Sequence, residues 1–584
     1  AGIAQQLQRK VAVDRAEAVG VGHAVAPEVR GVPVVGLRGH PVDVRRIGSR
    51  RVTDVAFAPL KTQVDGALGP DVQAMAITWT RPYRVGNMSI TSAFALGYAA
   101  IGSDTCNDPL AKSPVAPLAY VARATLLREQ NQAANAVQVM QEGRQRHEGA
   151  VAGDPARRDW VHLMRYHHGV ALFESGKAPD ARNLFDQVTR EAVQLPIGAE
   201  AGLRGGQCLV AEAKAKIADA EKALGMAKVE QKAQAEAAVK QAKAGLAEAA
   251  KVLERRSDEF KAAQPQADAR ARMLYDAAWA YRAAAADPAP AYTKLITEFP
   301  NLALAVEGRL EFAELLADAN KHDDAVKQLK DALDAEPTDK ATPPDTTDRI
   351  RVRLGAALFA KKDIPAALAQ FDAVAGNEKS AQRGVALYRA AECLLATGKA
   401  EEARAKLVIF RDNGAFHNIA GVSDRAVLRL GHALADLKQW EPSRQTLETL
   451  IARYSENNAW AVDARYGMGW ALQNQNRYDE AVNQYALVAQ KTTDERAGRA
   501  HLQIGLSRAA QKQWDNAGKA FATVYYGDFP PELHAAALVE HARALVEVKN
   551  LAEALRLLDR LPRELPADSP WHAAARELRT KAGK

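Results

Sequence analysis

One predicted helix carries side chains of the kinds that bind partners. Four of them recur three and four residues apart: Asp463, Tyr466, Trp470 and Asn474. This spacing places them on one face of the helix, and aromatic and arginine side chains dominate the energetics of protein interfaces. Neighbouring helical segments add candidates at corresponding positions, namely Phe359, Tyr388, Arg425, His432 and Arg499. This set suits an apolar or amphipathic peptide; packing of Tyr466 and Trp470 against adjacent helices is the alternative.

Adjacent acidic residues at two places have the types needed for acid and base catalysis. They are Asp323 with Asp324 and Glu401 with Glu402. Each pair opens a predicted helix, where carboxylates interact favourably with the positive end of the helix dipole. The sequence has no Gly-rich phosphate loop, GxSxG or HExxH motif, the patterns that bind phosphate, present a nucleophile or hold zinc. We therefore predict no catalytic or cofactor-binding residues; an enzyme with its site in residues 1–105 is the alternative.

Histidines and cysteines are the remaining candidates for metal ligands. His162, His167 and His168 lie in one predicted helix, but adjacent histidines point to different faces and no carboxylate or cysteine lies nearby at a ligand spacing. We expect these histidines to lie at the surface or to line a groove. The cysteines are Cys106, Cys208 and Cys393. They are far apart, and the last two fall in apolar helical patterns typical of buried small residues, so no metal site is predicted.

The candidate side chains belong to a repeated pair of helices. In residues 466–488 a first helix carries Gly469, a polar turn follows, and a second helix carries Ala481 and Tyr485 on one face. Neither helix can bury its apolar stripe alone, so copies must stack beside it. The same pairing of a small residue with another twelve positions later occurs at Gly355 and Ala367, Ala391 and Ala403, Gly431 and Ser443, Gly505 and Ala517, and Ala542 and Ala554.

These repeats resemble those of the tetratricopeptide-repeat family. Markers between Ala391 and Ala542 lie about 36 to 40 residues apart, close to that family's unit of roughly 34 residues. Looser copies extend the resemblance over residues 115–582. It implies an all-α solenoid of about nine or ten helix pairs and a non-catalytic scaffold that holds a protein or peptide partner in its concave groove. A cell-envelope assembly or bridging factor is an alternative, because Phe299–Pro300 and Phe529–Pro530 look similar to endings in envelope-associated bacterial members. A module that senses a small ligand is another.

Residues 199–262 interrupt the repeats with a segment rich in Ala, Lys, Glu and Gln, which are good helix formers. Apolar residues there fall seven apart, as in Leu246, Leu253 and Phe260, which is the seam spacing of a coiled coil. We predict an antiparallel coiled-coil hairpin. It either lies on the solenoid or projects as an arm for a partner or for self-association.

Composition divides the remaining chain. Residues 1–105 are rich in Val, Gly, Arg and Pro and lack helical periodicity, which predicts a poorly ordered extension, with a small β-rich domain as the alternative. The Pro-rich stretch 337–348 is a candidate linker. It would separate an N-terminal repeat block, 106–336, from a C-terminal block, 349–584.

The charges of the chain are nearly balanced. The 78 Lys and Arg residues exceed the 71 Asp and Glu residues by a net charge of +7 over 584 residues. Because the two signs are interspersed, we expect a solvated surface and no nucleic-acid partner. No stretch is long and apolar enough to span a membrane. A soluble protein of the cytoplasm, the periplasm or the cell envelope is expected, without a prediction of which.

Overall fold

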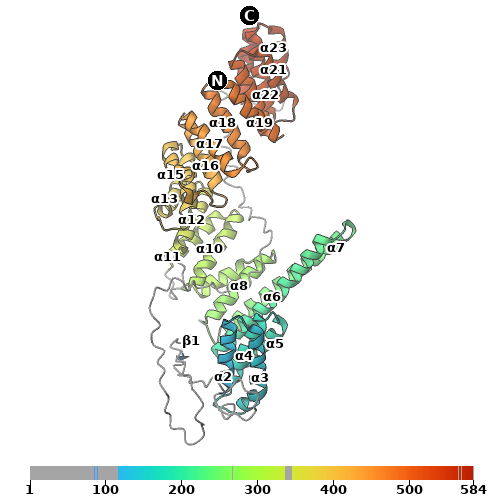
Figure 1. The fold of residues 1–584 in the computed structure, drawn as a ribbon, viewed down its shortest axis with the longest axis vertical. Helices are drawn as coiled ribbons and strands as arrows, with labels where there is room; N and C mark the ends of the chain where they lie inside the picture. Colours follow the sequence, from blue (N-terminus) through green and yellow to red (C-terminus); the bar gives the residue numbers. More distant parts are fainter. Residues whose placement is uncertain are drawn as a thin grey trace, which may run out of the picture. The chain divides into compact units, whose positions relative to one another are not determined.

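The computed structural model describes residues 84–85, 88–89, 116–265, 267–335, 345–562, 565–566 and 568–582. These residues form mainly α-helices that follow one another as antiparallel neighbours (Figure 1). The chain divides into two compact units, with the boundary between Phe312 and Ala313. We call them the N-terminal unit, described over 116–312, and the C-terminal unit, described from 313 onwards. The prediction of an all-α helix-pair solenoid is confirmed.

The N-terminal unit contains four complete helix pairs. Its helices are α2 (Ala116–Glu129), α3 (Ala133–Ala152), α4 (Asp159–Glu174), α5 (Ala178–Glu191), α6 (Pro196–Met226), α7 (Lys232–Glu259), α8 (Asp268–Ala283) and α9 (Ala289–Glu298). A short 3-10 helix, η3 (Val229–Gln231), joins α6 to α7. The following helix, α10 (Ala303–Asp318), contains the boundary between the units.

The C-terminal unit continues the alternation of first and second helices. Its helices are α11 (His322–Asp334), α12 (Thr346–Ala360), α13 (Ile364–Ala375), α14 (Arg383–Ala396), α15 (Ala400–Asp412), η4 (Gly414–Phe416), α16 (Ser423–Asp436), α17 (Trp440–Tyr454), α18 (Ala461–Asn474), α19 (Tyr478–Lys491), α20 (Glu495–Ala510), α21 (Trp514–Tyr526), α22 (Pro531–Glu547), α23 (Leu551–Leu558) and α24 (Pro570–Ala582). The acidic pairs open second helices as predicted, Asp323 and Asp324 in α11 and Glu401 and Glu402 in α15.

A large side chain of the second helix packs on a glycine of the first. Tyr485 is fully buried, and a Cβ atom added at Gly469 would lie 2.7 Å from its ring. Phe521 stands in the same relation to Gly505, at 2.4 Å. Real Cβ contacts are never this short, so only glycine lets the two helices approach so closely. The predicted packing of small residue against large is confirmed for these pairs.

The turn inside each pair has a recurring backbone geometry. In α18–α19 the residue Asn476 adopts a left-handed conformation with φ of 59°, and the amide of Arg477 donates to the carbonyl of Leu472 at 3.0 Å. This is the Schellman arrangement, which satisfies the last carbonyls of a helix. Lys362, Lys438, Lys512 and Lys549 hold the equivalent left-handed position in other pairs of the C-terminal unit. The turn therefore repeats with the helices and sets their antiparallel direction.

The pair α6–α7 departs from this pattern. Its helices are much longer than the others, and no residue between 214 and 245 is buried. The outer parts of both helices extend beyond the packed helices of the N-terminal unit (Figure 1). Of the predicted seam, Leu246, Leu253 and Phe260 are buried, at the base of the pair. The coiled-coil character of the outer part stays a prediction.

Two short strands are described before α2. Arg84–Val85 (β1) pairs antiparallel with Met88–Ser89 (β2). All other residues of 1–105, together with Cys106, lie outside the described residues, so the predicted extension and the β-rich alternative both stay predictions. Most of the predicted linker 337–348 lies outside them as well.

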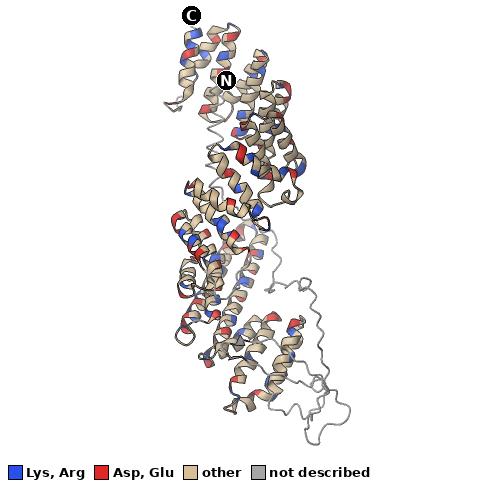
Figure 2. Cartoon of the chain, turned by 90° about the vertical axis from the view of Figure 1, so that its left-hand side faces the viewer, with Lys and Arg blue, Asp and Glu red and all other residues tan. Residues whose placement is uncertain are grey.

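The last helix closes the stack. Trp571 and Leu578 of α24 are buried against the preceding helices, whereas Arg576, Glu577 and Arg579 are exposed. A terminal repeat needs such a polar outer face, because no further repeat covers it. Acidic and basic residues are interspersed along the helices of both units (Figure 2). Among the described residues no helix is long and apolar enough to cross a membrane.

Candidate partner-binding surface

Several first helices of the C-terminal unit contact the first helix of the next pair. Each pairs with its own second helix, and α12 also contacts α14, α16 contacts α18, and α20 contacts α22. Helices that approach each other from repeat to repeat lie on the inner side of a curved stack. Side chains of these first helices that point away from the second helices therefore face the concave side of the stack. We call this the inner face.

The aromatic residues of α18 that we predict for this face are partly exposed. Tyr466 is half-buried and packs edge to face on Tyr485, with 5.4 Å between the ring centroids. Trp470 is also half-buried, and its carbonyl accepts a hydrogen bond of 2.8 Å from the side-chain amide of Asn474. One side of the Tyr466 ring is thus held by packing while the remainder meets solvent. The contact with Tyr485 fits the packing interpretation of Tyr466, and its exposed surface fits the binding interpretation.

Residues of α16 lie close to α18. The guanidinium of Arg425 lies over the ring of Trp460, 5.2 Å from its centroid. His432 is half-buried, and a Cβ atom added at Gly467 of α18 would lie 3.7 Å from its Nε2 atom. Arg425 therefore lies over the residue that precedes α18, and His432 lies beside α18 itself. A surface shared with Tyr466 and Trp470 stays a prediction.

Charged candidates on α18 and α20 are engaged in ion pairs. Asp463 is buried, with only 8% of its surface exposed, and its carboxylate lies 3.5 Å from the Arg496 guanidinium. Arg499 is half-buried and donates through Nε to Glu495 at 2.9 Å. Glu495 is itself exposed, so Arg499 can exchange this partner for a ligand, whereas Asp463 positions Arg496.

The two upstream candidates differ in accessibility. Tyr388 is buried, with 3% exposed, and its hydroxyl donates to Glu392 at 2.8 Å. Burial and the Glu392 carboxylate raise the pKa of Tyr388. Phe359 is half-buried on α12. Tyr388 thus belongs to the packing between helices and is not available to a partner, while Phe359 remains on the accessible inner face.

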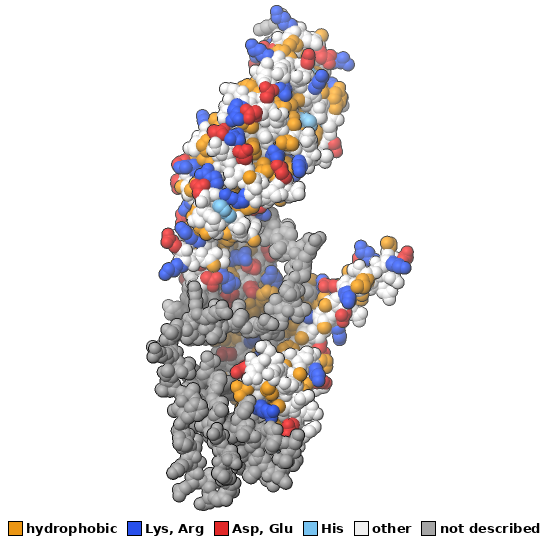
Figure 3. Space-filling view, viewed as in Figure 1, with side chains coloured by type: hydrophobic (Ala, Val, Ile, Leu, Met, Phe, Trp, Pro, Cys, Tyr) orange, Lys and Arg blue, Asp and Glu red, His pale blue; other side chains and the backbone are white. Residues whose placement is uncertain are grey.

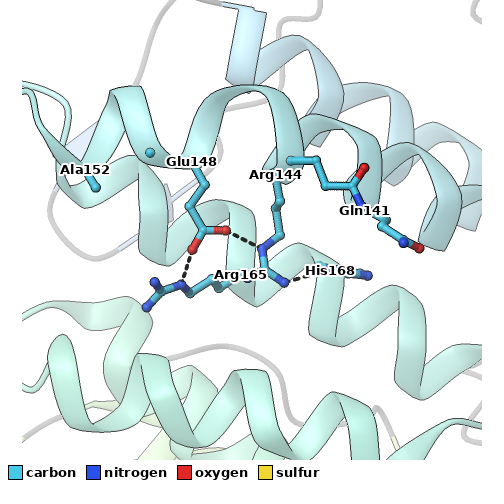
Figure 4. Close-up of a pocket in the computed structure, with 8 residues that line it drawn as sticks. Gln141, Arg144, Glu148, Ala152, Arg165 and His168 are labelled. Atoms are coloured by element: carbon cyan, nitrogen blue, oxygen red, sulfur yellow. Dashed lines mark hydrogen bonds and ion pairs between the residues drawn. The ribbon is translucent and has the colours of Figure 1, made fainter.

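The N-terminal unit contains a hollow that the sequence did not indicate. It has a volume of about 550 Å³ and lies between α3 and α4. Figure 4 shows the ion pairs in its wall: Glu148 accepts from Arg144 and from Arg165, each at 2.6 Å, and Arg144 bonds Nδ1 of His168 at 3.0 Å. The remaining lining residues are Gln141, Gln145, Gly149 and Ala152.

The charges in this wall satisfy one another. Burial alone would raise the pKa of Glu148, but hydrogen bonds from Arg144 and Arg165 outweigh it and the net shift of this pKa is downward. Burial lowers the pKa of His168 to about 4, and Arg144 acts in the same direction. His168 is therefore neutral at pH 7 and accepts through Nδ1, which leaves the proton on Nε2. The arrangement is that of a structural network between two helices.

The predicted surface position of the histidines is wrong. His162, His167 and His168 are all more than nine-tenths buried, because α4 is a first helix with neighbours on both sides. His168 does line a hollow, but His167 faces another side, where burial and Arg128 lower its pKa to about 4. In the part of the chain that the structure describes, no group of three or more His, Cys, Asp or Glu residues could hold a metal ion. Cys208 and Cys393 are buried as predicted, and burial raises the pKa of each to about 12.

The family comparison agrees with the repeat geometry. A model of the tetratricopeptide repeat matches residues 463–491, which contain the pair α18–α19 almost entirely. The pair α18–α19 is a tetratricopeptide repeat. A search of curated proteins found no match.

Solved structures resemble this repeat protein over long stretches at low identity. A tetratricopeptide repeat protein from Parabacteroides merdae is 14% identical and covers 48% of this chain and 99% of its own, with a TM-score of 0.34. The Cut9–Hcn1 hetero-tetramer of the APC/C is 15% identical over 82% of this chain and 99% of that chain, with a TM-score of 0.32. Yeast Tom70 is 10% identical over 80% and 96%, with a TM-score of 0.29. Scores this low carry no argument about function.

Proposed function

We propose that this chain is a non-catalytic scaffold that binds an apolar or amphipathic peptide segment of a protein partner on the inner face of α16, α18 and α20. The observation that carries this proposal is the pair Tyr466 and Trp470, which are large aromatic residues left partly exposed on a repeat surface. Tandem repeats of this kind serve as extended binding surfaces, because many side chains on their inner face are not needed for packing between helices.

The chemistry around the aromatic pair supports a peptide ligand. Aromatic rings supply contact area at a low cost in conformational entropy, and Arg adds donors for carbonyl and carboxylate groups. Asn474 uses its amide nitrogen for the Trp470 carbonyl, so its amide oxygen can accept from a peptide N–H. Arg425 and His432 of α16 and Arg499 of α20 are partly exposed. We exclude Tyr388 and Asp463 from this surface because both are buried.

The proposal is tested by selecting peptides from a random library on the full chain. The groove variant is Tyr466→Ala/Trp470→Ala. A matched control, Tyr478→Ala/Tyr526→Ala, removes two aromatic residues from the second helices α19 and α21. We expect selected peptides to lose at least about tenfold in affinity for the groove variant, since an interface hot spot contributes about 2 kcal/mol or more, and to bind the control as they bind the parent.

Two results would overturn the proposal. Equal binding by the groove variant and the parent places the working surface elsewhere. Equal losses in the groove variant and the matched control show that aromatic content, and not the inner face, determines binding. Circular dichroism of each variant must match that of the parent, because Tyr466 packs on the buried Tyr485.

A further inference from the structure

The turn between α6 and α7 exposes two large apolar side chains. Val229 is 88% exposed and Met226 is 73% exposed, and they are the most exposed large apolar side chains among the described residues. Both lie where the chain reverses direction through η3. We call residues 222–232 the arm tip. Exposing two large apolar side chains side by side costs free energy that a polar turn would avoid.

The tip is held away from the body of the N-terminal unit. Ala213 is the last buried residue of α6 and Leu246 is the first buried residue of α7. The helix from Ala213 to Met226 spans about 20 Å at roughly 1.5 Å per residue. Apolar side chains at the tip therefore cannot be explained as packing against the repeats.

The composition of the arm concentrates its apolar residues at the tip. Between residues 214 and 245 the apolar side chains larger than Ala are Ile217, Leu224, Met226, Val229 and Val239, and three of these five lie within the arm tip. Ile217 and Val239 are half-buried, whereas Met226 and Val229 are exposed. A helix pair that only needed to reverse direction would place small and polar residues at its apex, as the flanking sequence does along its sides.

Positive charge accompanies these apolar residues. Residues 214–245 contain seven lysines and four acidic residues, a net charge of +3 in a chain whose net charge is +7. Lys222, Lys228 and Lys232 lie within the tip, against one acidic residue, Glu230. Figure 3 shows hydrophobic, basic and acidic side chains together at the end of the arm. Apolar side chains ringed by lysine are the combination that binds the interface of an anionic bilayer.

We propose that the arm tip docks on an anionic membrane surface. Met226 and Val229 would enter the boundary between head groups and acyl chains, while Lys222, Lys228 and Lys232 would meet the lipid phosphates. Lysine suits this position because its long alkyl stem lies along apolar surface while the ammonium stays in the polar layer. The length of the arm lets the tip reach a bilayer without contact by the repeats, so this inference is independent of the peptide-binding proposal.

The test is flotation of the full chain with phosphatidylcholine vesicles made with and without phosphatidylglycerol. The apolar variant is Met226→Ser/Val229→Ser, and the charge variant is Lys222→Gln/Lys228→Gln/Lys232→Gln. Val548→Ser is the matched control, because Val548 is 46% exposed on the C-terminal unit. The substituted tip residues are exposed and touch no packed core, so the variants are expected to fold.

We expect the parent to float with the anionic vesicles and the control to match it. The apolar variant should bind at least about tenfold more weakly, since burial of two such side chains is lost. The charge variant should lose about fivefold per lysine, because each basic residue near an anionic surface contributes about a factor of this size, and added salt should reduce the binding of the parent.

Three results would overturn the inference. The parent does not float with anionic vesicles, or both tip variants float as well as the parent, or neutral and anionic vesicles bind equally. The second result would assign any binding to another part of the chain. If no lipid binds and chemical cross-links from position 229 instead capture a protein, the tip is a protein-docking element and the membrane assignment is wrong.

Discussion

The N-terminal and C-terminal units bury different kinds of side chain with the same repeated helix pair. Among the described residues, the buried His, Arg, Lys, Asp and Glu side chains of the N-terminal unit are His162, His167, His168, Arg256 and Arg270, whereas the C-terminal unit buries Asp463. The other buried polar residues of the C-terminal unit are neutral: Thr346, Ser423, Ser443, Thr446, Gln503, Ser507 and Ser569. The repeat fixes the backbone positions but does not require apolar contacts at all of them.

The guanidinium groups of the N-terminal unit show where the difference arises. Arg256 of α7 donates to the carbonyl of Gly202 at 2.8 Å and to Asp186. Arg270 donates to the carbonyl of Ser257 at 2.7 Å and to Glu298. Both arginines lie where the long pair α6–α7 joins ordinary repeats. We infer that the long pair α6–α7 disturbs the apolar packing pattern of the repeats. Hydrogen bonds from Arg256 and Arg270 to backbone carbonyls then hold this pair against its neighbours.

The largest effect that would test this comparison is expected at Arg270. Its side chain is 1% exposed. Arg270→Met would remove the donor to the carbonyls of Ser257 and Pro265 and would leave Glu298 with Lys261 as its remaining cationic partner. Removing one partner of a buried pair costs about 3–5 kcal/mol. Hydrogen exchange should show faster exchange in α7, α8 and α9, with α16–α20 unchanged. Arg255→Met is the control, because Arg255 is 68% exposed and a surface pair contributes about 0–1 kcal/mol. Equal effects of the two substitutions would show that Arg270 does not stabilise the junction between α6–α7 and the neighbouring helices.

The second effect concerns pH. His167 and His168 have folded-state pKa values of about 4, below the unfolded value of about 6.5. The folded chain binds fewer protons than the unfolded chain, so stability is complete above pH 6.5 and is lost as pH falls from about 6.5 towards 4. At pH 5 each histidine should account for about 2 kcal/mol of lost stability.

Thermal unfolding of the parent and of His168→Gln between pH 7 and pH 5 measures this effect. The variant should lose less stability than the parent over this range, because glutamine does not titrate. Hydrogen exchange should locate the change in α3 and α4. An identical pH dependence in both proteins would show that His168 is not held neutral by its surroundings.

The fold was predictable because the repeat signal is a packing signal. Gly469 and Tyr485 lie sixteen residues apart in the sequence, and this spacing brings them into contact across the helix pair. The acidic pairs mark the starts of α11 and α15 through the local effect of the helix dipole. The period also predicts Trp470 and Arg425 as inner-face residues, and both are partly exposed. Local periodicity therefore determines the fold, while the binding surface stays a prediction.

Burial between repeats was not predictable from this signal. Tyr388 and Tyr466 each lie three residues before the small residue of their first helix, yet Tyr388 is buried and Tyr466 is partly exposed, because the neighbouring helix differs at each place. The ion-pair hollow of Arg144, Glu148 and Arg165 joins residues of two helices whose spacing in the sequence shows no motif. The histidines of α4 were misplaced for the same reason. Such features depend on which neighbour a helix face meets, which a single sequence does not state.

A third prediction contrasts packed glycine with exposed glycine. Gly505→Ala brings a methyl group against Phe521 in the C-terminal unit, and overpacking of this kind costs about 1–3 kcal/mol. Gly225→Ala in the arm meets nothing within 4 Å and should stabilise its helix by up to about 1 kcal/mol. Urea unfolding followed by hydrogen exchange in α20–α21 and in α6 compares the two. Destabilisation by both substitutions would show that the arm is packed in solution and not exposed.

The smallest effect on the free energy of unfolding is expected for Arg425, a partly exposed charge of the C-terminal unit. Arg425 lies over Trp460, and a cation–π contact at a partly exposed site contributes about 0.5–1 kcal/mol. A double-mutant cycle with Arg425→Ala and Trp460→Leu, measured by urea unfolding, should return a coupling energy of this size. Removing Arg425 leaves no buried group unpaired, so its single-mutant cost should stay well below that of Arg270→Met. A cost near 3 kcal/mol would mean that the C-terminal unit also depends on buried guanidinium groups, and the contrast between the two units would then fail.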